Sequence, residues 1–236
     1  MSTESPPTEQ TILAALHVVA VPERATHALG YFPTSMKHLG VPVPALRAVL
    51  KPVIASLRKA PPGEATRLAL ALCATGIFDA KQAGFEVLNA LPKERRALTA
   101  EQVVGLAEGN DNWCSVDTYS TYLSGPAWRE GTLTDAMIAT WSASPDRWLR
   151  RTALVSTVPL NMKSRGGTGD TPRTLAVCAH HAHDRDDMVV KALSWALREL
   201  AERDPDAVEA FLTSHDVAPR VRRETRNKLD TGLKNP

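Results

Sequence analysis

The feature that most constrains this chain is the spacing of its apolar residues, which recur every three or four positions along nearly the whole sequence. That spacing is typical of amphipathic helices, whereas a half-buried strand alternates with a period of two. No convincing alternation of that kind occurs, so the sequence predicts an all-α fold. The predicted helices cover residues 10–20, 23–32, 43–58, 64–75, 79–90, 100–108, 115–123, 133–143, 146–158, 171–182, 186–202, 205–214 and 217–230.

Capping signals mark several of the predicted helix starts. Thr99 with Gln102 forms the pattern of a capping box, in which each side chain satisfies a free backbone N–H. Ser144–Pro145 and Asp204–Pro205 each place a cap residue before a proline suited to the first helical position. The helices come in pairs with short connectors that recur at roughly 35–45 residues, the range of HEAT repeats. We therefore expect an α-solenoid of HEAT-like helical repeats.

Length and composition favour one globular domain. The chain has 236 residues, of which 43% are hydrophobic, and this is enough for a single core. We expect residues 1–10 to be a disordered tail and residues 11–236 to form the domain. The net charge of +2 excludes a strongly basic, histone-like protein, but not a protein with a local basic surface.

The chain carries no sequence signal for a membrane or for the secretory pathway. No apolar run approaches the 18 or so residues that a spanning helix needs, and the N-terminus lacks the pattern of a signal peptide. Cys73, Cys114 and Cys178 are far apart and form no disulfide framework. We expect a cytoplasmic monomer without a membrane partner.

The most informative motif is Asn112-Trp113-Cys114-Ser115-Val116-Asp117. A spacing of four places Trp113 and Asp117 on one face of a helix. A carboxylate beside an aromatic ring can stabilise a sugar that becomes cationic during a reaction. Taken alone, the motif is better explained by a buried tryptophan next to a solvated aspartate.

Two further motifs combine a tryptophan with cations. Trp148 and Arg151 share a helical face, while Arg150 points elsewhere, and guanidinium groups bind phosphate in a bidentate way. A single stripe at spacings of four and seven holds Lys191, Trp195 and Arg198, which suits a nucleic-acid backbone. The alternative for both motifs is an ordinary amphipathic helix with one packed tryptophan.

Two other basic segments are weaker candidates. Arg220 and Arg223 form a stripe with Asn227 near the C-terminus, although such charge runs are usually solvated faces. The connector 161–172 is polar and rich in glycine, and it could be a mobile loop that touches phosphate through Lys163 and Arg165. The alternative is a passive surface insertion.

The segment Cys178–Asp184 contains three histidines and raises the question of a metal site. Its spacings resemble no closed zinc set. The residues instead suit the C-terminal end of a helix, where imidazole is favoured by the helix dipole. We expect no metal.

In order and separation, these motifs resemble the HEAT-like-repeat alkylpurine DNA glycosylases, the AlkD family. The resemblance runs from about Tyr31 to Asn227. It rests on Tyr31, Leu39–Val41 (LGV), Trp113–Asp117 (WCSVD), Trp148–Ala153 (WLRRTA), Lys191–Glu199 (KALSWALRE) and Arg222–Glu224 (RRE). It departs from the family at Asn112 and Cys114, where members often carry a second tryptophan and an extra acid, and in the length of the 161–172 loop.

The resemblance implies a role for each matching residue. Asp117 would be the catalytic carboxylate, Trp113 and Trp195 an aromatic pair on the sugar of the damaged nucleotide, Arg151 a phosphate contact, and Tyr31 a contact from the N-terminal helices. The supporting DNA-binding candidates are Trp148, Arg150, Lys163, Arg165, Lys191, Arg198, Arg220 and Arg223.

The resemblance also implies a function and a shape. The expected protein is a curved solenoid whose concave basic groove grips duplex DNA and releases cationic N3- or N7-alkylated purines without a cofactor, acting on the bacterial nucleoid. It would be monofunctional and would leave an abasic site. Two alternatives remain open: a catalytically silent module that binds DNA or protein, and a narrow-range glycosylase that protects a producer of a DNA-alkylating compound.

Overall fold

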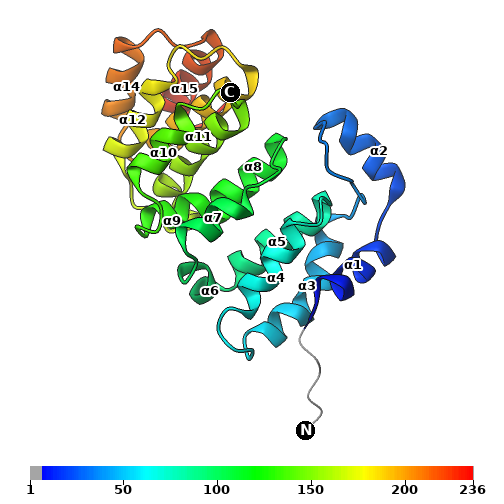
Figure 1. The fold of residues 1–236 in the computed structure, drawn as a ribbon. Helices are drawn as coiled ribbons and strands as arrows, with labels where there is room; N and C mark the ends of the chain where they lie inside the picture. The colour runs from blue at the N-terminus through cyan, green and yellow to red at the C-terminus, as the bar shows by residue number, and fades with distance from the viewer. Residues whose placement is uncertain (1–6, 236) are drawn as a thin grey trace. The chain divides into compact units, whose positions relative to one another are not determined.

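The regular structure of the chain is helical throughout. The computed structural model describes residues 7–235, and within that range every element is a helix (Figure 1). The only pairing of extended backbone in these residues is an isolated parallel bridge between Lys37 and Ile77. The contacts divide the chain into two compact units, which meet in sequence between Leu123 and Ser124.

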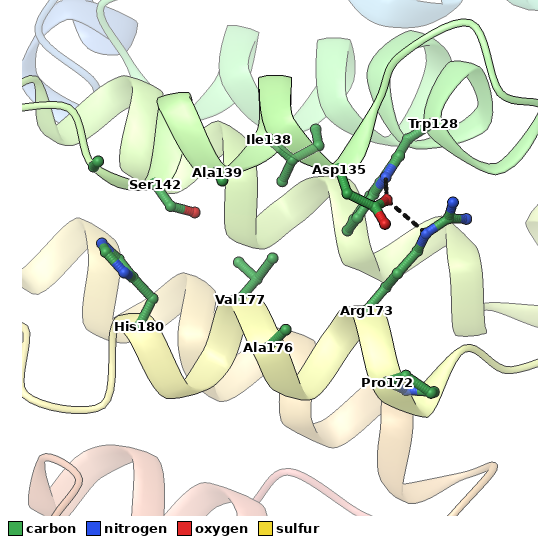
Figure 2. A pocket seen from close by; sticks show the side chains of 11 residues that line it. Trp128, Asp135, Ile138, Ala139, Ser142, Pro172, Arg173, Ala176, Val177 and His180 are labelled. Carbon is green, nitrogen blue, oxygen red and sulfur yellow. Dashed lines mark hydrogen bonds and ion pairs between the residues drawn. The ribbon is translucent and has the colours of Figure 1, made fainter.

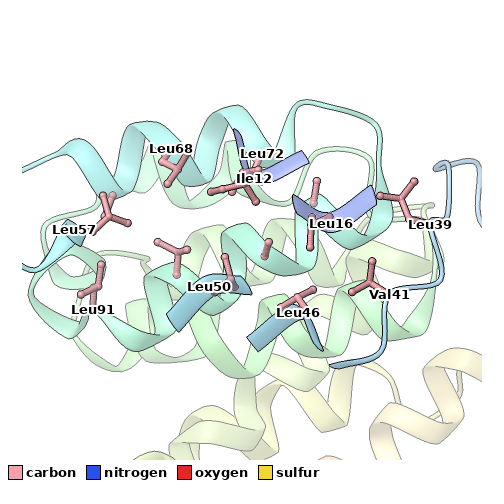
Figure 3. Packing of buried hydrophobic residues seen from close by; sticks show 14 residues of the cluster. Ile12, Leu16, Leu39, Val41, Leu46, Leu50, Leu57, Leu68, Leu72 and Leu91 are labelled. Atoms are coloured by element: carbon pink, nitrogen blue, oxygen red, sulfur yellow. The ribbon is translucent and has the colours of Figure 1, made fainter. Parts of the chain in front are cut away.

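The core of the first unit lies between four of its helices. The helices of this unit are α1(Glu9–Val18), α2(Pro22–Tyr31), α3(Val43–Leu57), α4(Glu64–Cys73), α5(Phe78–Ala90), α6(Pro92–Arg96), α7(Ala100–Leu106) and α8(Trp113–Tyr119). Ile12 and Leu16 of α1 point toward Leu46 and Leu50 of α3 and toward Leu72 of α4, and all five are almost fully buried (Figure 3). A π-helical turn, η1(Ser120–Ser124), continues α8 and carries the chain out of this unit.

The second unit is built around one buried helix. Its helices are α9(Gly125–Arg129), α10(Asp135–Ser142), α11(Arg147–Asn161), the 3-10 turn η2(Lys163–Arg165), α12(Thr171–His180), α13(Asp187–Ala201), α14(Pro205–Ser214) and α15(Pro219–Thr231). Every residue of α11 from Arg151 to Asn161 is buried. Helix α13 packs against α11 on one side and against α15 on another.

Helices that are close in sequence pack on one another in both units. Examples are α4 with α5, α10 with α11, and α12 with α13. This near-neighbour packing is characteristic of helical repeats, in which each repeat contacts mainly the next one. The predicted all-α, helical-repeat fold class is confirmed, while its curvature and basic groove stay predictions, as does the single domain.

Two of the three predicted caps are confirmed. The Thr99–Gln102 capping box forms in both directions, and the Asp204 side chain accepts a hydrogen bond from the backbone N–H of Ala207. The predicted cap at Ser144 is wrong. Helix α11 begins two residues later, because Asp146 accepts from the N–H of Trp148, while the Ser144 hydroxyl accepts from Asp146.

Several predicted boundaries need correction. Thr8 caps α1, so Glu9 and Gln10, which the sequence assigned to the tail, form the first turn of a helix; residues 1–6 of that tail lie outside the described residues. The short helices α6 and α9 were not predicted. Helix α11 continues through Pro159 to Asn161 instead of ending at residue 158. None of the described helices is long and apolar enough to cross a membrane.

Replacing Gly125 with alanine is expected to lower the free energy of unfolding by about 1–3 kcal/mol. A Cβ atom at this position would lie 2.2 Å from Cγ of Pro159 and 2.6 Å from the carbonyl oxygen of Ser156, so α9 and α11 would have to separate. Gly105→Ala is the matched control, because a Cβ there meets nothing within 4 Å. That control should be neutral or slightly stabilising, since alanine favours a helix. Urea unfolding of both variants measures the difference, and equal stability would contradict the close packing.

Candidate functional site

Helix α8 carries the candidate carboxylate and the first candidate tryptophan. Asn112 is fully buried and caps the helix, because its side-chain oxygen accepts from the backbone N–H of Ser115 at 2.9 Å. Trp113 is the first helical residue, and Asp117 follows one turn later. Both side chains are half-buried. Asn112, which departs from the family pattern, thus has a structural role that fixes where α8 begins.

Trp113 is one member of an aromatic cluster in the first unit. Its ring meets Tyr31 edge to face at a centroid distance of 5.4 Å and Phe32 at 5.8 Å. Phe32 also contacts Phe78 at 5.1 Å, and Phe78 stacks on His38 at 4.5 Å. Tyr31 is 69% exposed, so the cluster extends from the interior to the surface. The sequence pointed to Tyr31 but missed Phe32, because contacts between distant segments leave no local pattern.

A buried carboxylate fixes the loop that joins α2 to α3. Asp79, which is 2% exposed, accepts hydrogen bonds from the backbone N–H groups of Leu39 at 2.6 Å and Val41 at 2.8 Å. Between them, Gly40 has a φ of 78°, and a Cβ there would lie 2.2 Å from the carbonyl oxygen of Val21. Only glycine satisfies both conditions. The loop therefore has one conformation beside the aromatic cluster.

His38 of the same loop is held as a neutral ring. Its Nδ1 accepts from the backbone N–H of Gly40 at 2.9 Å, which places the proton on Nε2. Burial is the main cause of the lowered pKa of His38. The negative charge of Asp79 partly offsets this lowering, and the positive charge of Arg24 adds to it. The ring therefore serves as an apolar surface against Phe78 at neutral pH.

A second carboxylate ties the same loop to the start of α8. Asp111 accepts from the hydroxyl of Thr34 and from the backbone N–H of Ser35. The Asn112 amide also donates to Thr34. Burial by itself would raise the pKa of Asp111, but hydrogen bonds from Ser35 and Thr34 outweigh it and lower the pKa. The segment preceding Trp113 is thus fixed to the segment following Tyr31.

Asp111→Asn is expected to lower the free energy of unfolding at neutral pH. In acid, the variant and the wild type should be equally stable. A depressed pKa in the folded state contributes stability above the ordinary value of 3.8, and the contribution disappears as pH falls through the folded value. The urea midpoints of wild type and variant should therefore differ most near pH 7 and converge below about pH 3.8. A difference that stays constant with pH would show that the charge of Asp111 is not responsible.

Two reactive side chains near α8 are kept inert by burial. Burial, and then the charge of Asp117, raise the pKa of the Cys114 thiol to about 11, so it is a protonated thiol at neutral pH. Lys81 is 1% exposed, donates to the carbonyl of Glu108 and lies over the ring of Phe85. Burial lowers the pKa of Lys81. Neither is exposed as a nucleophile, and Lys81 instead satisfies a carbonyl in the turn that follows α7.

In the second unit, the two adjacent arginines of α11 are engaged in the fold. Arg151 is only 5% exposed and donates to the carbonyl of Met188. Arg150 donates to Asp184 at 2.8 Å and to the carbonyls of Ser144 and Pro145. These bonds tie α11 to the segments around it. A direct phosphate contact by Arg151 or Arg150 stays a prediction, and their hydrogen bonds favour a supporting role.

The predicted stripe on α13 forms as a partly exposed face. Lys191, Trp195 and Arg198 are half-buried, while the residues between them are buried. The Trp195 indole N–H donates to Glu199 at 3.0 Å. Burial lowers the pKa of Arg198, although Glu224 and Glu199 act in the opposite direction.

The cations of α13 and α15 meet at one exposed carboxylate. Asp187 forms ion pairs with Lys191 at 2.6 Å and with Arg220 at 2.9 Å. Lys191 is 40% exposed and Arg220 39%. Arg223 lies exposed on the same helix as Arg220. Arg220 also pairs with Glu224 at 3.3 Å, so two carboxylates share these cations.

The remaining predicted residues lie on α11 and in the 161–172 connector. Trp148, at the start of α11, is half-buried under the guanidinium of Arg147 at 4.9 Å. In the 161–172 connector, Lys163 is exposed, while the carbonyl of Arg165 accepts from Arg129 at 3.0 Å. Arg203 donates to the carbonyls of Asn161 and Gly167. Such anchoring favours a packed connector over a mobile loop, which was one of the two alternatives for this segment.

The histidine segment is likewise part of the fold. His181 is buried, and its pKa is lowered to about 4 mainly by burial. Residues 7–235 contain no group of three or more histidine, cysteine or acidic side chains placed to hold a metal ion.

Comparisons with known proteins match nearly the whole chain. The family model described as "DNA alkylation repair enzyme" matches residues 12–229. A solved structure described as a predicted DNA alkylation repair enzyme from Enterococcus faecalis superposes with a TM-score of 0.74 and 18% identity, covering 90% of this chain and 97% of that one. At that identity the likeness supports the fold alone. No curated protein sequence matches.

Proposed function

The chain belongs to the DNA alkylation repair enzyme family, and from this premise we propose that it is a glycosylase that hydrolyses the N-glycosidic bond of cationic N3- or N7-alkylated purines in duplex DNA. Family membership makes it an enzyme of DNA repair whose partner is DNA. Beyond family membership, the proposal specifies the reaction, the damaged base that is released and the residues that take part. It is a monofunctional reaction that leaves an abasic site.

The observation that carries the proposal is the arrangement of α8. Asp117 lies one helical turn after Trp113, whose ring is held by Tyr31 and Phe32 at a partly exposed edge of the first unit. A fixed carboxylate can stabilise positive charge that develops on a sugar, and it does so without reorganising during the reaction. The indole offers an electron-rich face to the same charge.

Release of a cationic purine requires few catalytic groups beyond this carboxylate. An N3- or N7-alkylated purine is already cationic, so when the bond from C1′ to the purine nitrogen breaks, the electron pair neutralises the leaving base. The sugar then resembles an oxocarbenium ion. Water adds to C1′ and loses a proton, which gives the abasic site. A general acid is unnecessary, and we assign to Asp117 the stabilisation of the sugar and the orientation of the water.

The cations of the second unit support binding to the DNA backbone. Lys191 and Arg220 share the exposed carboxylate of Asp187. Because exposed ion pairs are weak, a phosphate can replace Asp187 as their partner. Arg223 adds a further exposed cation. Each phosphate contact should contribute about 0.9 to the slope of log affinity against log salt on duplex DNA.

A base-release assay tests the proposal. Wild-type protein is incubated with duplexes carrying 7-methylguanine, 3-methyladenine or a bulky N7 adduct, and the free base is measured by chromatography. We expect release from at least one of these and no strand cleavage beyond that of an abasic site. Binding without release from any lesion would contradict the glycosylase and support a silent DNA-binding module.

A further inference from the structure

A cavity of about 580 Å³ that is open to solvent lies between α10 and α12 of the second unit, and none of the residues assigned to DNA lines it (Figure 2). Each helix contributes one stripe to it, and the middle is formed by Ile138 and Ala139 facing Ala176 and Val177. The two alanines create the space, because their side chains are too short to meet across it. Volumes of about 300–1,000 Å³ with mainly apolar walls are typical of small-ligand sites.

The charged groups at one end of the cavity are already paired. Asp135 accepts from the indole N–H of Trp128 at 2.7 Å and from Arg173 at 2.8 Å, as Figure 2 shows. The Arg173 guanidinium also lies over the Trp128 ring at 5.3 Å and within 3.5 Å of Asp170. At this end the polar groups of Trp128, Asp135 and Arg173 are therefore already engaged with one another.

The opposite end holds a buried polar atom without a partner. Ser142 is 3% exposed, and its hydroxyl makes no hydrogen bond. Figure 2 shows this hydroxyl directed into the space between α10 and α12, at the same end as His180. Buried polar groups in proteins nearly always have a hydrogen-bond partner, so the unpaired hydroxyl beside this cavity marks a place for one, which a water or a ligand atom can supply.

We infer that this cavity binds a neutral, largely apolar small molecule about two fused rings long, with a hydroxyl or carbonyl group that pairs with Ser142. The apolar body would lie along Ile138, Ala139, Ala176 and Val177. The eight residues from Asp135 to Ser142 are seven steps along the helix, or about 10 Å, which matches a molecule of that length. The site is independent of the proposed base release.

Matched probes test both parts of the inference. 1-Naphthol carries a hydroxyl where 1-methylnaphthalene carries a methyl group of similar size. Titrations of the full chain, followed by NMR, should show both probes binding and 1-naphthol binding up to about tenfold more tightly. Ser142→Ala should abolish that preference without weakening 1-methylnaphthalene. Because Ser142 has no hydrogen bond to lose, the variant should fold normally.

Filling the cavity provides the second test. Ala176→Leu should remove binding of both probes, whereas Ala179→Leu, exposed on the same helix but outside the cavity, should leave it unchanged. Both variants should release bases as wild type does. Failure of both probes to bind wild type, unchanged binding to Ala176→Leu, or a preference that survives Ser142→Ala would overturn the inference. So would a dimer that Ala176→Leu disrupts, because the occupant would then be a second copy.

Discussion

Asp117→Asn is expected to reduce base release by about 100- to 1,000-fold, while affinity for damaged DNA stays nearly unchanged. The amide has almost the same size as the carboxylate but cannot stabilise a cationic sugar. Helix α8 should persist, because Asn112 caps it and the fully buried Val116 anchors it. The loss should therefore appear in the single-turnover rate and not in binding.

The Cys114 thiol offers an independent check that only the charge has changed. Its pKa is raised to about 11, first by burial and then by Asp117. Removing that negative charge should lower the thiol pKa, which the pH dependence of alkylation measures. A large change in thiol accessibility would instead show that α8 has moved.

Glu101→Gln is the matched control for loss of a negative charge. Glu101 is an exposed acid on α7 of the same unit, and its neutralisation should leave base release at the wild-type rate. Equal rates for wild type and Asp117→Asn would remove Asp117 from the reaction. An equal loss in both variants would point to a general effect of charge on DNA binding.

The helices could be predicted because the information that specifies them is local. The spacing of apolar residues predicted the all-α fold class. The helix caps at Thr99 and Asp204 form as their residue types indicate. The errors arose where packing overrides local preference. Pro159 was expected to lie beyond a helix end, yet α11 runs through it because this part of the helix is fully buried. At Ser144, the competing cap was only two residues away at Asp146.

The candidate site was predictable only in part, for the same reason. The spacing of Trp113 and Asp117 is local and survives as one face of α8. The support for that face comes from Phe32, Asp79 and Asp111. Each of them contacts partners 38 to 81 residues away, and the two carboxylates act through backbone N–H groups. Sequence spacing contains no signal for such pairs.

The basic residues illustrate a second limit. From the sequence alone, Arg151 and Lys191 are equivalent cations. In the fold, Arg151 is buried, whereas the side chain of Lys191 is 40% exposed. Their difference depends on what surrounds each side chain. Arg151 meets the carbonyl of Met188 on a neighbouring helix, whereas Lys191 pairs with the exposed carboxylate of Asp187 one turn earlier on its own helix.

Asp79→Ala is expected to lower the free energy of unfolding by about 2–6 kcal/mol, because it leaves two buried N–H groups without an acceptor at about 1–3 kcal/mol each. Those groups belong to Leu39 and Val41, so the loop between α2 and α3 should lose its single conformation. Asp79→Asn retains one acceptor oxygen and should fall between alanine and wild type. Urea unfolding of the three proteins gives the order.

The same variant should also slow base release, although Asp79 is buried and cannot touch DNA. Loosening the loop frees His38, and with it the stack through Phe78 and Phe32 that holds Trp113. Trp113 is the only tryptophan in the first unit, so a fluorescence difference against Trp113→Phe reports its surroundings directly. If Asp79→Asn is folded and the Trp113 signal moves together with the rate, the loop positions the ring. Wild-type stability in Asp79→Ala would mean that the two N–H groups find other acceptors and that the ring has a different support.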